Sequence, residues 1–106
     1  MREIKVKDMI AAIRQNGLKQ AFGHLFVYED NLDPDTLNAA CALGQAMINL
    51  DLRGKSFRSP DYGGVDMVEN IVYLNDSKMY SLPQIADRLE EIYSKRMEGI
   101  VYIADE

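Results

Sequence analysis

Residues 33–50 read DPDTLNAACALGQAMINL, the longest apolar segment with helical spacing in the chain. Asp33 is a favourable N-cap residue, and Pro34 suits the first helical position, where its missing N–H is not needed. The apolar residues recur in two neighbouring rows, which predicts a helix that packs against more than one neighbour. These rows are Leu37, Ala40, Cys41, Gly44, Met47, Ile48 and Ala39, Leu43, Ala46, Leu50. We therefore expect one buried helix over residues 33–50.

Gly44 lies inside this predicted helix, among several alanines. A glycine in a helix interior costs about 1 kcal/mol relative to alanine. We therefore expect Gly44 to mark a close crossing with a second helix. Cys41 lies in the same apolar row and is expected to pack, because a buried cysteine behaves as a small hydrophobe.

The chain has 106 residues, of which 47% are hydrophobic, and this fits a single domain over residues 1–106. Seventeen acidic against twelve basic residues give a formal charge of −5, which argues against a nucleic-acid binder. No apolar run reaches the roughly 18 residues of a membrane span. The first ten residues lack a signal-peptide segment, and the single cysteine cannot form an internal disulfide. We expect a cytoplasmic protein.

Three further helices are predicted from apolar residues at helical spacing. The first covers residues 6–16 and ends at Asn16–Gly17, where glycine suits a left-handed cap. The second covers residues 65–75. The third begins at Ser81, because Ser81 and Gln84 have the spacing of a capping box. Its inward face is predicted to comprise Leu82, Ile85, Ala86, Leu89, Ile92, Tyr93 and Arg96.

Residues 23–29 and 100–103 are rich in β-forming residues and are predicted to be strands. We expect residues 25–28 to pair antiparallel with residues 100–103. A two-stranded ribbon is marginal alone, so it should pack on helices or extend through a second chain. The predicted fold class is α+β, with about four helices packed with a short antiparallel two-stranded ribbon.

Residues 51–64, DLRGKSFRSPDYGG, are predicted to form a long loop, and loops of this length are often mobile or functional. The loop mixes cations with aromatic residues, a combination that can stack bases, bind phosphates or contact a protein. An ordinary solvated loop is an equal alternative. These candidate binding residues are Arg53, Lys55, Phe57, Arg58 and Tyr62.

Other motifs do not predict chemistry. Gly54-Lys55-Ser56 resembles the end of a phosphate-binding loop, but Asn49 stands where that motif requires glycine. His24 and Cys41 are the only residues of their kinds, too few for a structural zinc site. The aspartates between residues 30 and 35 lack the glycine and glutamate of a calcium loop. We expect no catalytic residues, no metal and no cofactor.

The segments CALGQA at residues 41–46 and LND at residues 74–76 resemble a family of small uncharacterised proteins from phages and actinobacteria. The family pattern is a first helix ending in glycine, Cys-x-Leu-Gly-Ala, and a Trp-Asn-Asp turn before another helix. Gly17 fits this order, and the resemblance spans roughly residues 6–93. Leu74 replaces the tryptophan, and residues 100–103 lie outside the pattern. The resemblance implies a phage accessory protein with a positioned Asn75–Asp76 turn.

The leading hypothesis is a non-enzymatic protein-binding accessory protein. More specifically, we expect a phage-encoded modulator of a host protein that forms a homodimer. The alternative is a small ligand-binding domain or enzyme that acts on a phosphorylated small molecule. It would use residues 53–58 together with Asn75 and Asp76. Binding to nucleic acid is disfavoured by the net charge, and no membrane association is expected.

Overall fold

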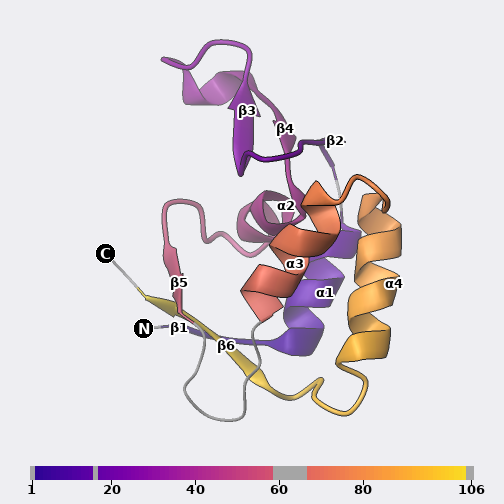
Figure 1. Cartoon of the computed structure of the whole chain (residues 1–106). Coiled ribbons are helices and arrows are strands. Elements are labelled where there is room, and N and C mark those ends of the chain that lie inside the picture. Colours follow the sequence, from indigo (N-terminus) through magenta and orange to yellow (C-terminus); the bar gives the residue numbers. More distant parts are fainter. Residues whose placement is uncertain (1, 16, 59–66, 105–106) are drawn as a thin grey trace.

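The computed structural model describes residues 2–15, 17–58 and 67–104, which form four α-helices and two three-stranded sheets. The α+β class is therefore confirmed. The helices pack together, and in Figure 1 one small sheet lies above them and the other at their lower left. The helices are α1 (Val6–Arg14), α2 (Ala42–Asn49), α3 (Met67–Asp76) and α4 (Leu82–Ile92). The strands are β1 (Arg2–Lys5), β2 (Lys19–Gln20), β3 (Phe26–Tyr28), β4 (Leu37–Ala40), β5 (Ser56–Arg58) and β6 (Ile100–Ala104).

The two predicted strands do not pair with each other. One sheet has the order β1-β6-β5 and is antiparallel, so β6 lies between two strands. The other has the order β2-β4-β3, with β4 parallel to β2 and antiparallel to β3. The predicted pairing of residues 25–28 with 100–103 is therefore wrong. A partner a few residues further along the chain is available to β3, and a short connection loses less entropy on closing than a long one.

The stretch at residues 33–50 is not one helix. Asp33 does act as an N-cap, accepting a hydrogen bond from the Asp35 N–H at 2.9 Å, but it caps a single 3-10 turn at Pro34–Thr36. The Glu29 N–H then donates to the Thr36 carbonyl at 3.0 Å and draws the chain alongside β3. Extended strand β4 follows, and α2 begins only after Cys41. Asp33 and Pro34 therefore begin a helical turn, as their capping preferences indicate. The alanines that follow form a strand because pairing with β3 outweighs their preference for a helix.

The core lies between the helices. The predicted stripe of α1 is confirmed, since the side chains at positions 6, 9, 10 and 13 are 0–1% exposed. The capping box of Ser81 and Gln84 is also confirmed at the start of α4. Ile92 and Arg96 were predicted to face inward, but Ile92 is 44% exposed and Arg96 is exposed. Helix α4 ends at Ile92, so Arg96 lies beyond it, while Leu89 and Tyr93 are buried as predicted.

Three predicted boundaries need adjustment. Helix α1 ends at Arg14, and Asn16 of its predicted cap lies outside the described residues. The predicted loop at 51–64 contains strand β5, while residues 59–64 lie outside the described part. Helix α3 continues through Asp76, and Val65 and Asp66 are also outside the described part. Among the described residues, no helix has the length and apolar character needed to cross a membrane.

Gly44 does mark a close approach, although the neighbour is not a helix. A Cβ atom built on Gly44 would lie 2.2 Å from the carbonyl oxygen of Leu25, in the segment before β3. The Cys41 N–H donates a hydrogen bond to this same oxygen at 3.2 Å. The backbone of residue 25 is therefore held against the first turn of α2, where only glycine leaves it room.

We expect Gly44→Ala to lower the free energy of unfolding by more than about 1 kcal/mol, because the overlap with a backbone atom outweighs the helix preference of alanine. Urea denaturation measures the loss. Gly17→Ala is the matched control, since nothing lies within 4 Å of a Cβ built there. Its effect should stay within roughly 0.5 kcal/mol. Equal stability of the two variants would contradict the proposed contact.

The start of α1 is held by the segment after α4. Lys5 makes no side-chain cap, and the N–H groups of Val6 and Lys7 donate to the carbonyls of Gly99 and Met97 instead. The Glu98 carboxylate binds the ammonium groups of Lys5 and Lys7 at 2.7 and 2.8 Å. These hydrogen bonds from Lys5 and Lys7 lower the pKa of Glu98 to about 2.

Because the pKa of Glu98 is lower in the folded protein than in the unfolded chain, its stabilising effect is present above about pH 4.5 and is lost toward pH 2. We expect Glu98→Gln to remove this part of the acid-induced loss of stability. Thermal unfolding of both proteins across this pH range tests it. The difference between them should shrink in high salt, since the ion pairs are exposed. Parallel pH profiles would contradict the assignment.

Candidate functional site

Asn75 is fully buried where α3 meets α2 and β2. Its Oδ1 accepts hydrogen bonds from Gln20 Nε2 and from the Ala42 N–H, both at 3.0 Å. Its Nδ2 donates to the Ala21 carbonyl at 2.8 Å and to Asp76 Oδ1 at 3.1 Å. Both ends of the amide are thus engaged by the protein itself. The side chain has no exposed surface for a ligand, so we assign Asn75 a structural role in place of the predicted binding role.

Asp76 is exposed and holds the turn between β2 and β3. Its Oδ1 accepts a hydrogen bond at 2.9 Å from the N–H of Gly23, a residue in the left-handed region with φ of +76°. This bond, together with the one from Asn75, lowers the pKa of the Asp76 carboxyl. The predicted Asn75–Asp76 turn is therefore the last turn of α3, and both residues bind the neighbouring sheet.

We expect Asn75→Ala to lower the free energy of unfolding by roughly 2–4 kcal/mol, because it leaves buried backbone groups of Ala21 and Ala42 without partners. Chemical denaturation measures the effect. Asn38→Ala, at an exposed position of β4, is the matched control and should change stability by less than roughly 0.5 kcal/mol. If the two substitutions proved equally mild, the Asn75 network would not stabilise the fold.

Arg53 contacts two aromatic rings that were not in the predicted binding set. Its guanidinium lies over the rings of Phe26 and Tyr28, at 5.5 and 5.3 Å from their centroids, and donates to the Tyr28 hydroxyl. The rings come from β3 and not from the loop that carries Arg53. The contacts of Arg53 therefore tie the segment after α2 to the edge strand of the second sheet.

Of the other loop residues predicted to bind, only Lys55 has a described side chain. Lys55 is half-buried just before β5, and its N–H donates to the Leu52 carbonyl at 3.0 Å. Phe57 and Arg58 lie in β5, with their side chains outside the described part of the structure. Tyr62 lies outside the described residues. Of the residues predicted to bind a phosphorylated molecule, Asn75 is therefore buried in the core, and Arg53 contacts the rings of β3.

Cys41 and His24 do not form a nucleophile–base pair. Cys41 is the N-cap of α2, only 5% exposed, and its Sγ accepts from the Gly44 N–H at 3.4 Å. Burial raises the pKa of the thiol. A buried thiol with a raised pKa is a poor nucleophile. Cys41 therefore packs in the core, as predicted from the sequence. It also caps α2, which was not predicted.

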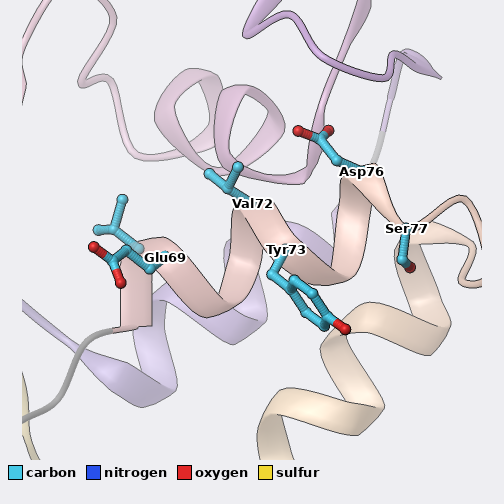
Figure 2. Close-up of a pocket in the computed structure, with 6 residues that line it drawn as sticks. Glu69, Val72, Tyr73, Asp76 and Ser77 are labelled. Carbon is cyan, nitrogen blue, oxygen red and sulfur yellow. The ribbon is translucent and has the colours of Figure 1, made fainter.

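An apolar surface on α3 and α4 is the most unusual exposed feature of the described residues. Tyr73 is 74% exposed and Met79 76%, beside Ile92 at 44% and Val72 at 37%. We call this set the α3–α4 surface: Val68, Val72, Tyr73, Met79 and Ile92. In Figure 2, Val72 and Asp76 project from one side of α3, whereas Tyr73 and Ser77 project from the side that faces α4.

Three hollows run across this surface and share their walls. The first, of about 560 Å³, lies along α3 (Figure 2). The second, of about 230 Å³, lies between α3 and α4 and shares Tyr73 and Ser77 with the first. The third, of about 210 Å³, lies on α4 and shares Tyr80 and Arg88 with the second. The three hollows are therefore neighbours along α3 and α4, and we call them together the track.

Sequence reasoning missed this track for identifiable reasons. Ile92 fits the inward stripe predicted for α4, and the spacing within α3 does not show that Tyr73 is exposed. Met79 lies in the turn between α3 and α4, where periodicity carries no information. Helical spacing does place Val68 and Val72 one turn apart on the same face of α3, and this is the sequence feature that could have indicated the first hollow.

The described residues contain no group of three or more side chains suited to hold a metal ion. Comparison of the chain with protein-family models, with curated proteins and with solved structures finds no match.

Proposed function

We propose that the chain is a non-enzymatic protein-binding accessory protein and that it binds its partner through the α3–α4 surface. The observation that carries this proposal is the exposure of Tyr73 and Met79, each about three-quarters exposed, beside Val72 and Ile92. Contiguous apolar side chains on a small domain are a typical mark of an interaction surface. Tyrosine and methionine are also enriched at protein interfaces.

The shape of this surface favours a protein over a small molecule. Small-molecule sites are concave and bury most of the ligand. The described residues that line the first hollow all lie between positions 68 and 77, on α3 and directly after its end. A protein segment can cover such an open track, whereas a small molecule would contact one wall.

The chemistry of the described residues gives less support to an enzyme. Cys41 is buried with a raised pKa, and the amide of Asn75 is occupied by protein partners. In the alternative site for a phosphorylated molecule, the guanidinium of Arg53 is already stacked on two rings of β3.

Three more specific parts of the proposal come from the sequence: a phage-encoded modulator, a homodimer and a cytoplasmic location. The resemblance of residues 41–46 and 74–76 to phage and actinobacterial proteins supports a phage-encoded modulator of a host protein. An exposed apolar surface is also the element that a homodimer would use. A cytoplasmic location suits the single, unpaired Cys41.

Capture of partners from cells of the natural host tests the proposal. We expect the double substitution Tyr73→Ser and Met79→Ser to abolish capture of a defined protein, because it removes the two most exposed anchors of the surface. Its melting temperature should stay close to that of the wild type, since both side chains are mostly exposed.

Leu32→Ser is the matched control, because Leu32 is 94% exposed and lies between β3 and β4, away from the α3–α4 surface. This control should retain capture. Capture that survives the double substitution would place the binding surface elsewhere, and a partner lost equally with Leu32→Ser would indicate nonspecific apolar adsorption.

A further inference from the structure

We propose that the second hollow of the track, between α3 and α4, receives a tryptophan side chain of the partner protein. This inference rests on the proposed function and names the anchor by which the partner is recognised. The properties of the hollow that carry it are its size, its aromatic walls, the neutrality of its lining and a hydrogen-bond acceptor.

The second hollow has the size of a site for one side chain. Its volume of about 230 Å³ is below the roughly 300–1,000 Å³ of typical small-molecule sites. It is also more enclosed than the other two hollows of the track. Leu74, only 6% exposed, lies at its inner end, whereas Tyr73 and Met79 are mostly exposed and stand at its opening. An anchor residue can therefore enter beside Tyr73 and Met79 and be buried against Leu74.

The walls of the second hollow suit an aromatic ring. Tyr73 and Tyr80 contribute aromatic rings, and Met79 contributes a thioether. Aromatic rings attract one another in offset or edge-to-face arrangements, and sulfur atoms make favourable contacts with ring edges. An aromatic occupant therefore gains more from these walls than an aliphatic occupant of similar size.

The lining of the second hollow favours a neutral occupant. Arg88 is the one charged side chain among its described lining residues, and its guanidinium binds the Glu91 carboxylate at 2.9 Å. A charged occupant would lose its hydration in the hollow without gaining an unpaired opposite charge. The anchor is therefore a neutral side chain.

Asn70 supplies the hydrogen-bond acceptor. It lines the hollow and is half-buried, and its Nδ2 donates to the hydroxyl of Tyr93 at 2.6 Å. Tyr93 is 4% exposed and belongs to the core, so this bond fixes the amide of Asn70. Among the described residues, no donor binds Asn70 Oδ1. An occupant with one N–H and no acceptor matches this oxygen, and the indole of tryptophan is the neutral aromatic side chain with that property.

A nuclear magnetic resonance titration of the isotope-labelled full chain tests the inference, with N-acetyl-tryptophanamide as the neutral probe. We expect roughly millimolar binding, the strength of a single anchor, with shifts centred on the residues of the second hollow. The analogue methylated at the indole nitrogen lacks the donor and should bind about threefold to tenfold more weakly. N-acetyl-leucinamide, which lacks the ring, should also bind more weakly.

Substitutions on the protein separate the hydrogen bond from the walls. Asn70→Ala should bind the indole probe and its methylated analogue equally, whereas Asn38→Ala, at an exposed position of β4, should keep the preference. Because the preference is a ratio within one protein, a change in the stability of Asn70→Ala does not alter it. Tyr73→Ser with Met79→Ser should weaken both probes by about threefold or more, and Leu32→Ser should weaken neither.

Equal binding of the two probes to the wild type, or an unchanged preference in Asn70→Ala, would overturn the inference. Free indole that bound at least about tenfold more tightly than the amide would also overturn it, since the hollow would then be a small-molecule site. If capture of the host protein required Tyr73 and Met79 while N-acetyl-tryptophanamide neither bound nor competed, the proposed function would stand and only the tryptophan anchor would be excluded.

Discussion

The amide of Asn75 is the interaction on which the arrangement of this protein depends. One side chain on α3 satisfies the N–H of Ala42 at the start of α2 and the carbonyl of Ala21 after β2. A hydrogen bond to a backbone group in a buried place is costly to leave unmade, so α2, α3 and the second sheet are positioned together. The asparagine amide carries an acceptor and a donor on one planar group, so a single side chain can satisfy both backbone groups.

Two further contacts extend this constraint. The carbonyl of Leu25 is held by the Cys41 N–H and fits against the helix because residue 44 is glycine. The side chain of Gln45, only 2% exposed, donates to the carbonyl of Leu18 at 3.0 Å. These contacts join the polar backbone of the small second sheet to an otherwise apolar α2. The sheet has strands of two to four residues and would be marginal without them.

The same constraint determines what α3 presents to solvent. Ile71 is fully buried and Leu74 nearly so on the inner side of α3, and Asn75 anchors its end, so the helix cannot rotate to hide its outer side. Val72 and Tyr73 are consequently held in the open. A surface fixed in this way loses little conformational freedom when a partner binds, which favours recognition by a preformed site. The fold and the proposed function are linked through α3.

The sequence by itself determined the elements whose signals are local. The stripe of α1, the capping box at Ser81 and the need for glycine at position 44 follow from spacing and side-chain chemistry, and the structure confirms them. The α+β class followed from the same patterns. Only the tertiary structure decided that residues 37–40 pair as a strand, that Asn75 is buried and that Ile92 is exposed. Each of these outcomes depends on which distant segment lies next to the residue, and periodicity along the chain does not encode that neighbour.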